Sequence, residues 1–95
     1  MPAYLVAEIK ILDQVKYQAY HPLAAAAIAH HGGRVVAGTR VVVGLENVDA
    51  QSRWVIVEFD SLPQGRKFFE SAEYQSAIAA REDAAIVRMV LLDGN

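Results

Sequence analysis

Arg53-Trp54-Val55-Ile56-Val57-Glu58-Phe59-Asp60 is the stretch that decides the fold, since β-branched and aromatic residues dominate it and Ser61 follows with helix-start chemistry. Alternate residues of the predicted strand point to opposite faces. Val55, Val57 and Phe59 point to one face and are apolar, and the opposite face is mostly apolar but carries Glu58. A strand that is apolar on both faces has something packed on both sides. In a chain of 95 residues, helices can cover one side, and we expect a second subunit on the other.

The chain before this strand predicts one strand and one helical region. Residues 3–11 alternate with period two, which predicts a strand. Residues 14–31 have helical spacing, but Pro22 lacks an N–H, so we expect a kink or break there. Gly32 and Gly33 are expected to end the helix, because glycine accepts the left-handed conformation of a C-cap.

The remaining segments predict further strands and a pair of short helices. Residues 34–46 are rich in valine and predict one or two strands, with a bulge or bend at Gly38 or Gly44. Residues 47–52 are polar and are expected to form a loop. Ser61-x-x-Gln64 is a capping box, Ser71 begins a second helical piece, and residues 85–92 predict the last strand.

The order of elements is βαββαβ, which predicts an α+β fold in a single domain over residues 1–95. We expect a four-stranded antiparallel sheet with both helical regions on one face. The other face would stay bare and apolar, which is a liability in a monomer. Pairing two such faces across a two-fold axis removes the liability, so the sequence predicts a homodimer.

Composition narrows the function classes. Hydrophobic residues make up 54% of the chain, above the usual range of about 45–50% and consistent with a second buried surface. The net charge of −2, without a Lys/Arg-rich run, argues against nucleic acid as a partner. No apolar stretch reaches the length of a membrane span, and no basic segment precedes an apolar run at the start. We therefore expect a cytoplasmic protein that does not bind membranes. The absence of cysteine excludes thiolate catalysis and Cys-based metal sites.

Four motifs carry a resemblance to a known family: YQAY at 17–20, HGGR at 31–34, VIVEF at 55–59 and SAEYQSAIAAR at 71–81. The chain resembles domain-of-unknown-function family thirteen-thirty, a widespread bacterial family. The resemblance implies a ferredoxin-like fold that pairs into a dimeric α+β barrel. Relatives in that superfamily include cofactor-independent monooxygenases, dismutase-like haem enzymes and small binding or degradation proteins. The resemblance thus implies a pocket more than a particular chemistry.

Tyr74 and Arg81 are the first candidate site residues, because they lie two turns apart on one predicted helix face. A phenol and a guanidinium can bind a carboxylate or an enolate, with the arginine as bidentate donor. The structural alternative is that Tyr74 packs on the sheet while Arg81 pairs with an acid such as Glu58 or Glu82.

Two other groups of side chains are candidates for chemistry. Glu8 and Glu58 lie on strands expected to be neighbours, and nearby carboxylates can create a general acid or base. The alternative is that each carboxylate pairs with an arginine, for which the candidates are Arg34, Arg53 and Arg88. The histidines, at positions 21, 30 and 31, lack the i, i+4 spacing of helical metal sites, so we expect no metal. A single histidine, His21 or His31, acting as a base in a pocket with Tyr17 stays open as an alternative to an exposed helical histidine.

The sequence therefore predicts a homodimer that binds a small carboxylate-bearing or aromatic metabolite in a pocket between sheet and helices. We expect the polar edge of the pocket to consist of Tyr17, Tyr20, Arg34, Glu58, Tyr74 and Arg81. No cofactor is expected. Two alternatives stay open: a cofactor-independent enzyme, monooxygenase-like or isomerase-like, and a ligand-free dimer that acts through protein contacts.

Overall fold

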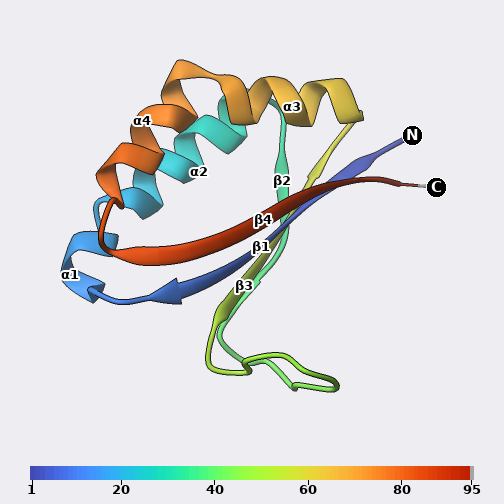
Figure 1. The fold of residues 1–95 in the computed structure, drawn as a ribbon. Coiled ribbons are helices and arrows are strands. Elements are labelled where there is room, and N and C mark those ends of the chain that lie inside the picture. Colours follow the sequence, from blue (N-terminus) through green and yellow to red (C-terminus); the bar gives the residue numbers. More distant parts are fainter. Residues whose placement is uncertain (95) are drawn as a thin grey trace.

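The computed structural model describes residues 1–94 and has the predicted βαββαβ order, with each helical region split in two (Figure 1). The elements are β1 (Ala3–Ile11), α1 (Gln14–Tyr17), α2 (Tyr20–His30), β2 (Arg34–Thr39), β3 (Arg53–Phe59), α3 (Leu62–Glu70), α4 (Ala72–Ala80) and β4 (Ala85–Asp93). The predicted α+β fold is confirmed.

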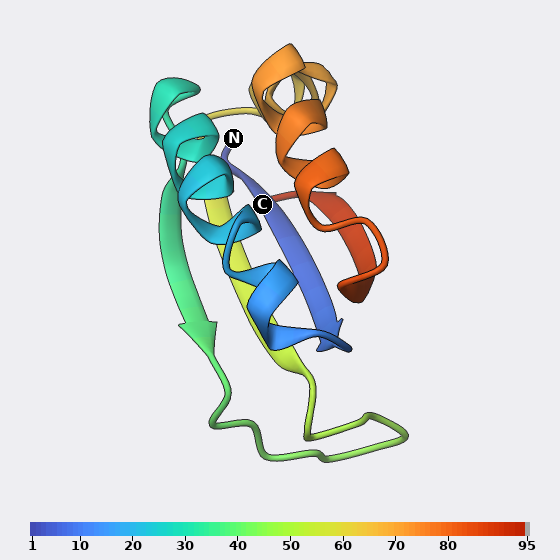
Figure 2. The same ribbon diagram turned by 90° about the vertical axis from the view of Figure 1, so that its left-hand side faces the viewer.

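The four strands form one antiparallel sheet in the order β2-β3-β1-β4. Leu5 on β1 lies opposite Val57 on β3 and Leu91 on β4, so the apolar rows of the central strands share one face. All helices cover that same face, and the other is left open (Figures 1 and 2). This two-layer arrangement is the ferredoxin-like topology.

The core lies between the sheet and the helices and is built around aromatic side chains. Phe59, Phe68 and Tyr74 are almost fully buried. The ring centres of Phe68 and Tyr74 are 4.4 Å apart, and those of Phe59 and Phe68 are 5.2 Å apart. Each such side chain contributes about 1.5–3 kcal/mol by leaving water, so this cluster fixes α3 and α4 on β3.

The first helical region breaks before Pro22, not at it. The Asp13 carboxylate accepts from the backbone N–H of Lys16 and caps α1, as predicted. Pro22 is the third residue of α2 and has no N–H for the carbonyl of Gln18, so the helix stops one turn upstream. After the break the chain turns so that Tyr17 and Tyr20 are both buried.

The valine-rich segment forms one strand, the first of the two predicted alternatives, and that strand ends at Thr39. Residues 40–52 form a long loop that extends beyond the sheet (Figure 2, green). The bulge in β2 lies between Val35 and Ala37, not at Gly38 as predicted. Gly32 has φ of 73°, which confirms the predicted glycine end of the helix.

Ser61 and Ser71 cap the two later helices as predicted, since their hydroxyls accept from the backbone N–H groups of Gln64 and Tyr74. The second half of the capping box is absent, because the Gln64 amide instead donates to the carbonyl of His31. This 2.6 Å bond ties the start of α3 to the end of α2.

The open sheet face is largely apolar. Its central positions hold Val6 opposite both Ile56 and Val90, and Trp54 opposite Glu8. Val90 is 54% exposed and Ile86 is 55% exposed in the single chain. None of the helices within residues 1–94 is long and apolar enough to cross a membrane.

Candidate functional site

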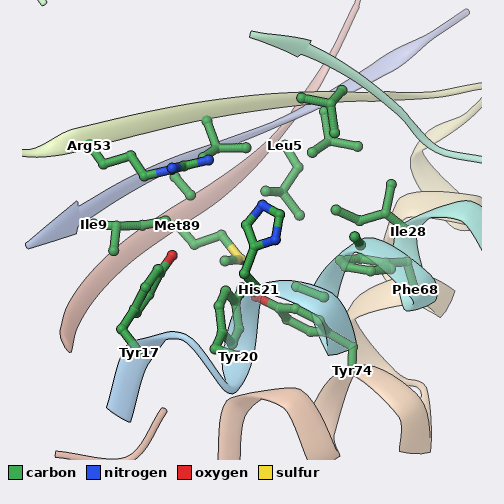
Figure 3. Close-up of a pocket in the computed structure, with 16 residues that line it drawn as sticks. Leu5, Ile9, Tyr17, Tyr20, His21, Ile28, Arg53, Phe68, Tyr74 and Met89 are labelled. Atoms are coloured by element: carbon green, nitrogen blue, oxygen red, sulfur yellow. Dashed lines mark hydrogen bonds between the residues drawn. The ribbon is translucent and has the colours of Figure 1, made fainter. Parts of the chain in front are cut away.

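A cavity of about 110 Å³ lies between the sheet and α2 (Figure 3). Its wall is almost entirely apolar, with polar atoms from a few side chains. The lining residues are Leu5, Ala7, Ile9, Tyr17, Tyr20, His21, Ala24, Ala25, Ile28, Val35, Arg53, Val55, Val57, Phe68, Tyr74 and Met89.

Small residues on facing elements create this hollow. Ala7 lies at the centre of the floor, opposite Val55 on β3 and Met89 on β4. Ala24 and Ala25 form part of the wall on α2. Because alanine lacks carbons beyond Cβ, the sheet and the helix approach closely without filling the space between them.

Two tyrosine hydroxyls meet at the helical side of the cavity. The Tyr20 and Tyr74 oxygens are 2.7 Å apart, and the Tyr74 hydroxyl points at the Met89 sulfur at 3.9 Å. Burial raises the pKa of Tyr20 above its ordinary value, and Tyr74 adds to the shift. Tyr20 therefore stays protonated at neutral pH. One hydroxyl donates to the other, and the second proton has only a thioether as acceptor, which is weak.

The polar end of the cavity is formed by Tyr17, His21 and Arg53 (Figure 3). Burial raises the pKa of the Tyr17 phenol, and the Arg53 guanidinium is the strongest of the charges that oppose this rise. The Arg53 side chain is thus close enough to Tyr17 to favour negative charge there. None of the residues that line the cavity is a carboxylate.

The structure brings three of the six predicted site residues into this cavity, namely Tyr17, Tyr20 and Tyr74. Arg81 lies behind them: its guanidinium carbon is 5.1 Å from the ring centre of Tyr20, a cation–π contact. It lines a separate hollow between α4 and β4. Arg81 therefore supports the tyrosine pair from outside the cavity.

Arg34 and Glu58 lie on the open face of the sheet, so the prediction that all six residues share one pocket edge is wrong for this pair. Their guanidinium and carboxylate are 3.2 Å apart, and Asp60 is 3.5 Å from Arg34 on its other side. Strand alternation explains the placement, because Glu58 falls between the inward residues Val57 and Phe59.

Glu8 and Glu58 do not form a carboxylate pair. Glu8 is opposite Trp54 and Glu58 is opposite Tyr4, four residues apart along β1, which is about 13 Å. Glu8 instead approaches Arg88 at 3.6 Å. The alternative of separate ion pairs describes both carboxylates better.

His30 and His31, unlike His21, lie outside the cavity. His30 lies 3.5 Å from Glu73, and the His31 ring contacts the carbonyl of Ala27. Within the part of the chain that the structure describes, no cluster of histidine and acidic residues could hold a metal ion.

Sequence reasoning missed Arg53 and Met89 as cavity residues, whereas it considered His21, with His31 as the alternative, as a base beside Tyr17. A signal existed for Arg53: it shares the parity of Val55 and Val57, so it belongs to the inward face. A similar signal existed for Met89, which lies two residues before Leu91 on β4 and so points to the same inward face. Helical spacing could not decide between His21 and His31, because the helix break before His21 resets the helical phase.

The profile of the family described as "Domain of unknown function (DUF1330)" matches residues 2–95. No curated protein matches the chain.

Solved structures show the same fold at low identity. A protein of unknown function from Rhodopseudomonas palustris is 17% identical, with a TM-score of 0.73 over 99% of this chain and 82% of that one. SnoaB, a cofactor-independent oxygenase from Streptomyces nogalater, is 13% identical, with a TM-score of 0.71 over 99% and 93%. A dimeric protein of unknown function with a ferredoxin-like fold, from Bacteroides fragilis, is 13% identical, with a TM-score of 0.68 over 98% and 96%.

Proposed function

The chain belongs to the DUF1330 family, and we propose that it is a homodimer that binds one small metabolite per subunit. The binding site is the cavity between its sheet and its helices. The ligand is aromatic or carries a carboxylate, and it occupies the space between the sheet and α2.

The observation that carries this proposal is the cavity itself. An engineered apolar cavity of about 150 Å³ in another protein stays dry and binds benzene. The cavity here, about 110 Å³, has a similar scale and opens to a polar end, so it suits one ring or a short acyl chain with a polar group. An apolar wall with a few polar atoms at one end is typical of small-molecule sites.

The open sheet face supports the dimer. Tyr4, Val6, Trp54 and Ile56 form its centre, and Leu92 at its edge is 50% exposed in the single chain. A contiguous apolar surface of this kind marks an interaction site. The dimeric Bacteroides fragilis protein of the same fold supports a second copy as the partner.

A second candidate function is a cofactor-independent oxygenase, which the likeness to SnoaB favours. His21 and the Tyr20–Tyr74 pair supply a base and hydroxyl donors at the cavity. The cavity volume would restrict such an enzyme to a substrate with one ring. A ligand-free interaction module is less well supported, because it gives no role to the cavity or to the unpaired buried atom of Arg53.

Native mass spectrometry of gently purified protein tests the proposal, since it reads subunit number and retained small molecules together. We expect a dimer that carries up to one extra mass per subunit, released on acidification. A monomer, or a dimer that stays bare and takes up none of a panel of small aromatic acids and phenols, would contradict it. Oxygen uptake with a monocyclic phenol, absent after Tyr20→Phe, would favour the oxygenase over simple binding.

A further inference from the structure

Arg53 is a cation on the otherwise apolar inner face of the sheet. It is the first residue of β3, opposite Ile9, and it alternates with the inward residues Val55 and Val57. Arg53 is half-buried there, and the buried part of a charged side chain is costly unless it is paired. The cost indicates that the position serves something other than packing.

Arg53 has no anionic partner among residues 1–94. It takes part in none of the ion pairs there, and its Nε atom is buried without a hydrogen-bond acceptor. Asp49 borders a neighbouring surface hollow together with Arg53 but does not form an ion pair with it. A buried guanidinium donor without an acceptor is uncommon in a folded protein and needs an explanation.

The other arginines that the sequence singled out do not line the cavity. Arg34 is held by two carboxylates on the opposite face of the sheet. The Nε atom of Arg81 is also buried without an acceptor, but Arg81 stacks on the Tyr20 ring and lines a separate hollow. Arg53 is therefore the cation available to a molecule inside the cavity.

We propose that Arg53 binds the anionic group of the ligand and that the ligand is a monocyclic aromatic monocarboxylate. This inference rests on the proposed function and adds the chemical class of the ligand. The ring lies in the apolar cavity against Met89, and the carboxylate lies at the polar end between Arg53 and the Tyr17 hydroxyl (Figure 3). A guanidinium matches a carboxylate with two parallel N–H···O bonds, and a phenol supplies a third donor.

A singly charged group fits this end better than a doubly charged one. Arg53 supplies one positive charge, and the remaining polar lining groups at this end are the neutral Tyr17 hydroxyl and the His21 ring. A phosphate would require further donors or cations to replace its water. The available donors thus favour a carboxylate over a phosphate.

The test compares benzoate, benzyl alcohol and phenyl phosphate as probes of the full chain by isothermal titration calorimetry. Charged hydrogen bonds lead us to expect benzoate to bind roughly tenfold or more tightly than benzyl alcohol. Arg53→Gln should lower the affinity for benzoate to the level of benzyl alcohol. The affinity for benzyl alcohol should stay unchanged in this variant. Arg34→Gln, on the opposite face of the same sheet, is the matched control and should change neither.

Arg53→Lys guards against a general effect of the substitution, because it keeps the charge and loses the planar fork. It should weaken benzoate binding and still prefer benzoate to benzyl alcohol. The inference is overturned if wild-type protein shows no preference for benzoate, or if Arg53→Gln keeps that preference. Tighter binding of phenyl phosphate would overturn the assignment of a carboxylate. Failure of all three probes would overturn the proposed function and this inference together, whereas equal binding of benzoate and benzyl alcohol would overturn the inference alone.

Discussion

Filling the cavity should stabilise the protein and abolish ligand binding at once. Ala7 lies at the centre of the floor, is 2% exposed, and belongs to the central strand β1. Ala7→Ile adds three carbons that point into the hollow, and isoleucine suits a strand. The same change in a fully packed core would destabilise it, so the sign of the effect reports whether the space is empty.

The magnitude follows from the cavity volume. Empty core volume costs about 24 cal/mol per Å³, so a cavity of about 110 Å³ costs at most roughly 2.6 kcal/mol. Burying three more carbons contributes about 2.4 kcal/mol by transfer from water, a second estimate of the same gain. Imperfect fit removes part of it, since overpacking costs about 1–3 kcal/mol. We expect a net gain of about 1 kcal/mol in the free energy of unfolding.

The assay is urea denaturation followed by circular dichroism, paired with calorimetric titration of benzoate. Ala85→Ile is the matched control, because Ala85 lies on the inner face of β4 outside the cavity lining. The control should keep the affinity of the wild type. A free energy of unfolding at least about 2 kcal/mol lower in Ala7→Ile, together with unchanged benzoate affinity, would show that the cavity is not empty and does not bind the ligand.

Three further outcomes are expected. Tyr20→Phe removes the partner of the Tyr74 hydroxyl and should lower the free energy of unfolding, measured by urea denaturation, by about 1–2 kcal/mol. An unchanged free energy of unfolding would show that the hydroxyl pair does not stabilise the core. The raised pKa of Tyr20 means that its contribution is complete below about pH 10, where unfolded tyrosine ionises, and is lost as pH rises further. Between pH 8 and pH 11 the free energy of unfolding should therefore decline more steeply for wild type than for Tyr20→Phe, by up to about 1.4 kcal/mol per pH unit. Equal declines in the two proteins would contradict the role of Tyr20 ionisation. Ile56→Lys on the open sheet face should yield monomers in sedimentation velocity, whereas Val15→Lys on exposed α1 should not; dimers of Ile56→Lys would argue against the facing-sheet pairing.

Periodicity was sufficient to predict the sheet and the helical face. The period-two alternation of β1 predicts which of its residues point to the helices, and its burial pattern confirms the prediction. Side-chain caps at Asp13, Ser61 and Ser71 fixed three helix starts, because each depends on residues within one turn. Local rules predict such features well.

The valine-rich segment shows where local rules fail. Val41, Val43 and Leu45 alternate like a strand, yet each is at least 80% exposed in a loop. β-propensity largely reflects packing against neighbouring strands, and this stretch lies beyond the end of the sheet, where no strand within residues 1–94 pairs with it. The bulge between Val35 and Ala37 likewise depends on pairing with β3.

The candidate site was only half predictable for a related reason. Tyr17, Tyr20 and Tyr74 follow from helical spacing, but the cavity arises where Ala7 faces alanines of α2, a juxtaposition of distant segments. The alternation of side chains along β3 is enough to put Glu58 on the open face of the sheet and Arg53 on the face that lines the pocket. The residue types gave candidate chemistry, and the strand faces determined which candidates can act together.

The most direct test of the cavity as the ligand site uses the methionine methyl groups. The chain has two methionines: Met89 lines the cavity, and Met1 is 73% exposed and serves as an internal reference. We would record carbon-13 methyl spectra of methionine-labelled protein during titration with benzoate. The account predicts that the Met89 signal moves to saturation, driven by the ring of the probe, while Met1 stays in place. A saturating titration in which Met89 does not move, or the absence of any binding, would contradict it.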